Sequence, residues 1–339
     1  MKSALVAVIA LAAAIGAAPQ PDVQSMTTAE LIGQRIVTGY VGTTPPRAVL
    51  RAVKLGHIGG VILFANNMPK PATARRAIKK LQATAKAAGR PPLFLMIDQE
   101  GGIVQRLPTL PPTLTPAQMG RANDPAATAL KQGKATGRAL KKYGFNVNLA
   151  PVVDVPRVKN SFLGNRAYSR HADVVAGAGC GFAQGNEAGG VAATFKHFPG
   201  LGRAGADTDF DDVKINATEA QIESGLAAYK QCQPSFVMIA SARYPKLGIN
   251  VPSSLSPKTY ELLKGTGFTG LTITDAMETP QFSATGSDAT RAVQAGIDVV
   301  LYGQAFGRAM RAFDKLRAAG LDRSALESAA ARIIELKTR

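Results

Sequence analysis

The stretch PLFLMIDQEGG, at residues 92–102, is the part of the sequence that says most about the fold. It begins with six apolar residues and then changes abruptly to Asp98, Gln99 and Glu100. A short apolar run without alternation is typical of a parallel strand whose two faces are both covered. Polar residues directly after such a strand are typical of a functional loop. We therefore predict a buried parallel strand that ends at a binding or catalytic site.

Seven more apolar runs of this kind occur along the chain, and segments with helical spacing lie between many of them. The clearest helical segments cover residues 74–88, 126–142, 172–188, 218–231 and 288–295. Eight strand and helix pairs in a chain of 339 residues predict a single-domain (β/α)8 TIM barrel, an α/β fold. A doubly wound open sheet is the alternative, and the lack of a GxGxxG loop makes it less favoured. The predicted strands cover residues 35–41, 60–65, 92–98, 145–154, 192–197, 235–240, 270–275 and 297–302.

Four of the predicted strands end in charged side chains. The third ends at Asp98, the fourth at Asp154 in NLAPVVDV, the fifth at Lys196 and His197, and the seventh at Asp275 in LTITDAM. In a barrel these ends lie on one face, where the loops after the strands form the active site. Bringing charges together is costly unless they serve a ligand. A single Asp would also fit a helix cap, but four charged ends together predict a site.

The first 18 residues have the pattern of a secretory signal peptide. Lys2 precedes an apolar, Ala-rich run at residues 4–18 that ends in small residues, and Pro19 leaves the cleavage position open. An uncleaved anchor helix is the alternative, but the run is shorter than the ~20 residues that span a bilayer. We therefore predict that a mature chain, 19–339, is secreted or exported to the periplasm or cell envelope, without a transmembrane segment. There, Cys180 and Cys232 either form a disulfide or remain two buried thiols.

The charge balance excludes some partners and favours others. Lys and Arg number 40 against 23 Asp and Glu, for a net charge of +17. The basic residues are spread along helical segments without an aromatic platform or a nucleic-acid-binding motif, so we expect no nucleic-acid partner. An anionic cell envelope would attract such a protein. With three His, two Cys and no CxxC or HExxH spacing, no metal site is expected.

Six segments, in order along the chain, resemble the successive motifs of glycoside hydrolase family 3. The resemblance is strongest to the single-domain β-N-acetylhexosaminidase branch of that family. It implies a barrel without a cofactor and a retaining exo-glycosidase for terminal β-linked sugars, above all N-acetylglucosaminides of cell-wall or chitin-type glycans. The chain ends soon after the eighth repeat, so no second, sandwich domain is expected. The segments are GVILFANN (60–67), IDQEGGIVQRL (97–107), NLAPVVDV (148–155), GNRAYS (164–169), KHFPGLG (196–202) and TITDAM (272–277).

The resemblance also assigns roles residue by residue. Asp275, in TDAM, matches the nucleophile that forms the covalent glycosyl-enzyme, and a helix cap is the alternative. A sugar offers many hydroxyl groups and no charge, so fixed donors and acceptors are suited to bind it. Lys196 and His197 could instead be a core pair, and the arginines could form surface ion pairs. The residues that match the family's sugar-binding positions are Asp98, Arg106, Arg166, Lys196 and His197.

The resemblance breaks down in the loop GRAGADTDFDD, at residues 202–212. In the family branch this loop ends in Asp-Ser-His or Asp-Thr-His, and the His is the general acid/base. Here Asp207 and Thr208 match, so Asp207 is assigned to support the loop, but Asp209 occupies the His position. A second departure is Ser241, where a His often precedes the Tyr-Pro pair.

Two interpretations of Asp209 follow. In the first, Asp209 is the acid/base, and neighbouring charges on Asp207, Asp211 and Asp212 raise its pKa. In the second, the acid is lost, and the barrel is a weakened enzyme or a glycan-binding protein whose acidic loop is a solvated turn. These motifs do not identify the acetamido pocket, so β-glucosidase or β-xylosidase specificity also remains open.

Overall fold

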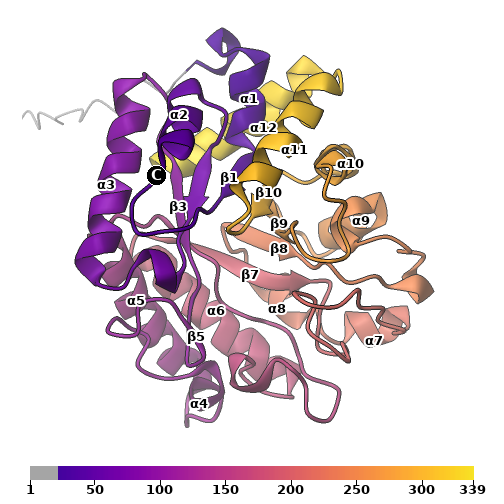
Figure 1. Ribbon diagram of the computed structural model, residues 1–339. Helices are drawn as coiled ribbons and strands as arrows, with labels where there is room; N and C mark the ends of the chain where they lie inside the picture. The colour runs from indigo at the N-terminus through magenta and orange to yellow at the C-terminus, as the bar shows by residue number, and fades with distance from the viewer. Residues whose placement is uncertain (1–21) are drawn as a thin grey trace, which may run out of the picture.

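Eight parallel strands close into a barrel in this computed structural model, which describes residues 22–339 (Figure 1). The predicted signal segment, residues 1–18, lies outside the described residues. Strand β1 (Ile36–Thr38) pairs with β2 (Gly60–Ile62) on one side and with β10 (Val299–Tyr302) on the other, which closes the barrel. The prediction of a (β/α)8 barrel is confirmed. The other barrel strands are β3 (Phe94–Ile97), β6 (Val147–Asn148), β7 (Ala192–Phe198), β8 (Phe236–Ile239) and β9 (Leu271–Ala276).

Two covered faces explain the continuous apolar runs. In β3, Phe94 and Met96 belong to the cluster inside the barrel, to which the other strands also contribute side chains. Their neighbours Leu95 and Ile97 belong instead to the core between the strands and the outer helices. Since successive side chains of a strand point to opposite faces, one strand fills two apolar layers, and every position in β3 is buried.

Helices cover the outside of the barrel (Figure 1). Local signals set their ends: Asp124 caps α5 by accepting from the N–H of Ala127 at 2.9 Å, and Gly144 ends it in a left-handed conformation. The single helix predicted over 218–231 is wrong, because two short helices form there with Gly225, a poor helix former, in the break. The helices are α1 (Thr28–Gln34), α2 (Arg47–Leu55), α3 (Pro71–Ala87), α4 (Pro116–Gly120), α5 (Pro125–Tyr143), α6 (Ala172–Ala188), α7 (Glu219–Glu223), α8 (Ala227–Gln231), α9 (Pro257–Lys264), α10 (Ser287–Ala295), α11 (Phe306–Ala318) and α12 (Arg323–Thr338).

A disulfide joins Cys180, in α6, to Cys232, directly after α8. The sequence left open whether these cysteines form a disulfide or remain two buried thiols, and the structure has the disulfide. The bridge connects two helices that also pack against each other, so it reinforces the outer layer below β7 and β8. Within residues 22–339, no helix combines the length and apolar character needed to cross a bilayer.

Candidate active site

The C-terminal ends of the barrel strands surround a cavity of about 390 Å³. Every side chain that the family resemblance assigned to the site lines this cavity, although these residues lie in or after four different strands. The long-range folding of the barrel therefore brings them together, as expected for loops on one face of the fold. They are Asp98, Arg106, Arg166, Lys196, His197, Asp207, Asp209 and Asp275.

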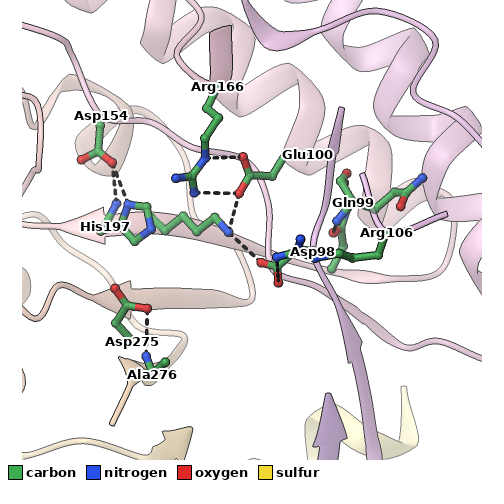
Figure 2. A network of polar contacts seen from close by, with 11 residues as sticks. Asp98, Gln99, Glu100, Arg106, Asp154, Arg166, His197, Asp275 and Ala276 are labelled. Carbon is green, nitrogen blue, oxygen red and sulfur yellow. Dashed lines mark hydrogen bonds and ion pairs between the residues drawn. The ribbon is translucent and has the colours of Figure 1, made fainter. Parts of the chain in front are cut away.

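Asp98 lies directly after β3 and is held by two cationic side chains (Figure 2). Nζ of Lys196 lies 2.9 Å from Oδ1 of Asp98, and Nη2 of Arg106 lies 3.5 Å from Oδ2. Burial alone would raise the pKa of Asp98, but Lys196 and Arg106 outweigh it and lower the pKa to about 2. Asp98 is therefore ionised at neutral pH and offers fixed acceptor oxygens to the cavity.

Glu100 is a fully buried carboxylate that the sequence analysis did not assign to the site. It lies in β4 (Gln99–Gly101), which forms a hairpin with β5 (Val104–Gln105) after β3. Its oxygens accept from Nε and Nη2 of Arg166 at 2.9 and 3.0 Å, and Oε1 lies 2.7 Å from Nζ of Lys196 (Figure 2). The signal was present in IDQEGG, where Glu100 stands two residues after Asp98.

Lys196 lies between Asp98 and Glu100 and is only 3% exposed. Burial would lower the pKa of this lysine, but the two carboxylates raise the pKa above its ordinary value. Lys196 therefore stays charged inside the protein, and its orientation is set from both sides. Because Lys196 and His197 line the cavity, the alternative of an isolated core pair does not hold.

Asp154, one of the four charged strand ends that predicted a site, does not line the cavity itself but fixes the orientation of His197. Nδ1 of the His197 ring lies 2.7 Å from Oδ2 of Asp154, which also accepts from the backbone N–H of His197 at 3.2 Å (Figure 2). A carboxylate at Nδ1 favours the tautomer with the proton on Nδ1, which leaves Nε2 as an acceptor. The other oxygen of Asp154 accepts from the N–H of Leu201 at 2.6 Å, so Asp154 also holds the start of the following loop.

Asp275 is the second-last residue of β9 and stands apart from this charge network (Figure 2). Its Oδ1 accepts from the backbone N–H of Ala276 at 2.8 Å. None of the ion pairs formed within residues 22–339 includes Asp275. Asp275 lines the cavity, so a carboxylate without an ion-pair partner faces the space where an electrophilic carbon would lie.

The loop after β7 brings Asp209 to the same cavity as Asp275. The backbone N–H of Asp209 donates to Oδ1 of Asp207 at 3.0 Å, so Asp207 contacts the backbone next to the acid/base candidate. Burial and the charges of Asp275 and Asp207 raise the pKa of Asp209 to about 6. The Asp209 side chain nevertheless remains open to solvent, so a bound sugar that covers it would strengthen the effect.

Of the three carboxylates that the sequence analysis expected to raise the pKa of Asp209, Asp207 does so, but Asp211 is not among the main causes and neither is Asp212. Asp212 forms a paired contact with Arg243, whose Nε and Nη2 lie 2.8 and 3.1 Å from its two oxygens. This ion pair neutralises Asp212 and anchors the end of the loop to the segment after β8. Within the described chain, the charge that raises the pKa of Asp209 most is on Asp275, which belongs to another strand.

Glu278 and Ser241 are two further residues near the site. Glu278 lines the cavity and accepts from the N–H of Gly303 at 2.9 Å, and burial raises the pKa of its carboxyl. Ser241, which stands where relatives often have His, is buried after β8, and its Oγ has no hydrogen-bond partner among the described residues. Ser241 does not line the cavity and cannot supply an imidazole. His197 is the one histidine among the residues that line it.

The arrangement suits a neutral ligand rich in hydroxyl groups. Two buried carboxylates hold Lys196 and Arg166 as fixed donors, while Asp98 and Nε2 of His197 provide acceptors. Beside these groups lie one carboxylate with a raised pKa, Asp209, and a second, Asp275, without a cation partner. Such a cavity can bind a sugar and also supply a nucleophile and a proton donor.

Known proteins share this sequence pattern. Residues 27–336 match the family described as Glycosyl hydrolase family 3 N terminal domain. An uncharacterized secreted glycosyl hydrolase of Arthroderma benhamiae is 34% identical over 285 residues, which cover 79% of this chain and 80% of that protein. Beta-hexosaminidase A of Pseudoalteromonas piscicida is 30% identical over an alignment of 373 residues, which covers 93% of this chain and 61% of that protein.

A solved structure shares the fold. The glycoside hydrolase family 3 beta-N-acetylglucosaminidase from Paenibacillus sp. str. FPU-7 has a TM-score of 0.86 and 29% sequence identity with this chain. The match covers 92% of this chain and 62% of the Paenibacillus chain. The chain therefore spans less than two thirds of the length of this protein and of the Pseudoalteromonas relative.

Proposed function

This chain belongs to glycosyl hydrolase family 3 and is a glycoside hydrolase that acts on O-glycosyl bonds, and we propose that it is a retaining exo-enzyme for terminal β-linked sugars. The sugar we propose is N-acetylglucosamine, because a beta-hexosaminidase and a beta-N-acetylglucosaminidase are among the proteins that it resembles. The observation that carries the proposal is the pair of carboxylates Asp275 and Asp209 at one cavity, with the charge of the first raising the pKa of the second. Two carboxylates with different proton affinities suit retaining hydrolysis.

The first step transfers the sugar to Asp275. The Asp275 carboxylate attacks the anomeric carbon while the bond from this carbon to the leaving oxygen breaks. Protonated Asp209 donates its proton to that oxygen, so the leaving group departs as a neutral alcohol. With a pKa of about 6, roughly a tenth of Asp209 is protonated at pH 7, and cover by the substrate increases this fraction.

The second step releases the sugar to water. Ionised Asp209 takes a proton from a water molecule as the water oxygen attacks the anomeric carbon. The ester bond to Asp275 then breaks, the Asp275 carboxylate is restored, and Asp209 is protonated again for the next cycle. This sequence uses only side chains and water, and two displacements at one carbon retain its configuration.

The remaining cavity residues hold the terminal sugar. Asp98 accepts from two hydroxyl groups, and Lys196, His197, Arg106 and Arg166 provide the neighbouring contacts. Their support is the buried ion-pair network, in which Glu100 and Asp154 position the cations and the imidazole. Prearranged polar groups reduce the reorganisation needed at the transition state, so this network acts on rate as well as binding.

The rival function is a catalytically weakened glycan-binding barrel. It needs the sugar contacts but neither a nucleophile nor a raised pKa on Asp209. The uncompensated charge of Asp275 and its effect on Asp209 favour the enzyme. β-Glucosidase and β-xylosidase activities are the alternatives in specificity, since none of the cavity contacts identifies a partner for an acetamido group.

We also propose that the enzyme is exported and works in the cell envelope or medium. The support is the signal-like sequence at residues 1–18, a relative described as secreted, and the Cys180–Cys232 disulfide, which is typical of oxidising compartments. Export would bring the enzyme to polymeric glycans outside the membrane.

Hydrolysis of 4-nitrophenyl N-acetyl-β-glucosaminide tests the proposal. Asp275→Ala should lower kcat by at least about 10³-fold because it removes the nucleophile. Asp211→Ala is the matched control, since Asp211 is an exposed carboxylate of the same acidic loop that does not line the cavity. Equal rates for the wild type and Asp275→Ala would refute the nucleophile. Rates on the corresponding glucoside and xyloside show which sugar the enzyme prefers. If the wild type hydrolyses none of the three substrates, the glycan-binding function is favoured over the enzyme.

A further inference from the structure

Three helices account for most of the net positive charge of the protein. Helices α2, α3 and α5 contain thirteen of the 40 Lys and Arg residues and none of the 23 Asp and Glu residues. The remainder of the chain is therefore close to neutral, although the whole carries +17. The thirteen residues are Arg47, Arg51, Lys54, Arg75, Arg76, Lys79, Lys80, Lys86, Lys131, Lys134, Arg138, Lys141 and Lys142.

These helices form one continuous surface, which we call the basic face. α2 packs against α3, and α3 packs against α5, and they follow one another around one side of the barrel (Figure 1). All thirteen basic side chains are exposed. The sequence pattern, with charges spread along separate helices, did not show this concentration, because only the barrel places the three helices side by side.

None of the thirteen forms any of the ion pairs found within residues 22–339. Basic residues elsewhere are often neutralised, as in the pairs Arg243–Asp212, Arg291–Asp288 and Arg332–Asp298. Like charges on adjacent helices repel one another and create a strong local potential. An extended polyanion relieves this repulsion and gains by releasing its own counterions.

The contact between α3 and α5 shows how the face is arranged. The guanidinium of Arg75 lies over the Tyr143 ring, 5.1 Å from its centroid, and its Nη2 donates to the backbone O of Lys142 at 3.4 Å. Cations of the two helices are thus brought together across the junction without an acidic residue between them. The positively charged surface is therefore continuous from α3 to α5, as binding of an extended polymer requires.

We propose that the basic face binds a linear polyanion of the cell envelope, a polymer that carries phosphate or carboxylate groups at regular intervals. A lipid surface fits less well, because these helices expose no aromatic side chain and only Leu55 and Leu130 as large apolar ones, at about 40% each. A nucleic acid fits less well, because Tyr143, the aromatic ring of the face, is covered by Arg75. The face would hold the enzyme at its glycan substrates, and its binding does not depend on the proposed catalytic residues.

The test compares two variants of equal charge. The first replaces four lysines of the basic face by Gln, and the second replaces four exposed lysines from other parts of the surface. Binding to immobilised inorganic polyphosphate and to polygalacturonate is measured at 50 mM and 200 mM salt. The polymer that binds more tightly identifies the preferred ligand group, phosphate or carboxylate. The basic-face variant carries K79Q, K80Q, K131Q and K134Q, and the control carries K159Q, K246Q, K264Q and K315Q.

We expect the wild type to bind at least one polymer and to lose affinity as salt increases. The basic-face variant should bind at least about tenfold more weakly at 50 mM salt, with a shallower salt dependence, and the control should stay within about twofold of the wild type. Both variants should hydrolyse the 4-nitrophenyl substrate at the wild-type rate, which shows that they are folded. Equal losses in the two variants, no binding by the wild type, or tighter binding to phosphatidylglycerol vesicles or single-stranded DNA than to both polymers would overturn the proposal.

Discussion

Nζ of Lys196 lies 2.7 Å from Oε1 of Glu100, and neither side chain has appreciable contact with solvent. Glu100 comes from the hairpin after β3, whereas Lys196 comes from the end of β7. The same carboxylate also accepts both hydrogen bonds from Arg166. A single buried anion therefore sets the positions of two cations that line the cavity, and removing it leaves Lys196 paired with Asp98 alone and Arg166 without its ion pair.

Glu100→Ala should destabilise the protein by about 3–5 kcal/mol, because it leaves Lys196 and Arg166 with less compensation inside the protein. Urea unfolding measures the loss. Glu223→Ala is the matched control, since Glu223 pairs with Lys230 on the surface, where an ion pair contributes about 1 kcal/mol or less. Similar losses for the two variants would contradict the role given to Glu100.

Asp154→Asn should lower kcat/KM by at least about tenfold while the protein stays folded. The amide no longer imposes the tautomer with the proton on Nδ1 of His197, so the imidazole loses its fixed acceptor at Nε2. Steady-state kinetics and the pH dependence of kcat/KM measure the effect. A purely structural role would instead change the unfolding midpoint and leave the pH dependence unchanged.

Asp209→Ala should lower kcat by about 10²- to 10⁴-fold on a substrate with a poor leaving group, because proton donation is lost. A dinitrophenyl glycoside, whose leaving group needs no proton, should be attacked by Asp275 at close to the wild-type rate. Azide should then restore turnover and give a glycosyl azide, since it replaces the water that Asp209 activates. Unchanged activity of Asp209→Ala on the poor leaving group would refute its role.

The wild type should also lose kcat/KM as the pH rises through about 6, because Asp209 must be protonated to act as the acid. A carboxyl whose pKa is raised holds its proton at higher pH. The fall in kcat/KM should therefore occur at a higher pH than the pKa of an ordinary Asp. The pH profile of the Asp211→Ala control should keep the same limb. A rate that stays constant from pH 5 to 8 would contradict this assignment.

Phe210→Ala should raise KM for an N-acetylglucosamine disaccharide by about 3- to 10-fold and leave the methyl glycoside unaffected. Phe210 lines the cavity next to Asp209 and is 75% exposed, so its ring is available to stack on the sugar that leaves. Ile103→Ala is the control, because Ile103 is 67% exposed but does not line the cavity. Equal effects on the two substrates would exclude a stacking role.

Lys337→Met should make the protein more stable below pH 7, by about 5 kcal/mol. Burial lowers the pKa of Lys337 to about 7, against an ordinary value of 10.5, so the unfolded chain binds more protons between these values. Wild-type stability therefore rises as pH increases from 7 to 10.5, and the advantage of the variant should shrink over that window. Denaturant unfolding at several pH values measures it, with Lys264→Met, at an exposed lysine, as the control. An advantage that is the same at pH 6 and pH 10.5 would contradict the buried charge.

Local sequence predicted the position of every barrel strand, because each fills two apolar layers and so appears as a short continuous run. It did not predict the bounds, since the run at 145–154 forms a strand only at Val147–Asn148. The prediction that charged strand ends meet on one face holds for Asp98, Lys196, His197 and Asp275, which line the cavity, but not for Asp154, which contacts His197 instead. Residues 218–231 were predicted less well: their helical spacing indicated one helix, but Gly225 allows the chain to turn into two. Helix propensity is weak over so short a segment, and packing decides it.

By itself, then, the sequence determined the barrel, the family, and the departure from it at Asp209. The tertiary structure alone decided which charges compensate one another. Lys196 meets Asp98 across 98 residues of chain and Arg166 meets Glu100 across 66, while Asp212 turns away from Asp209 to Arg243. It also joined α2, α3 and α5 into one basic face. The physical reason is that electrostatic energy depends on distance in space and on burial, and neither can be calculated from positions along the chain.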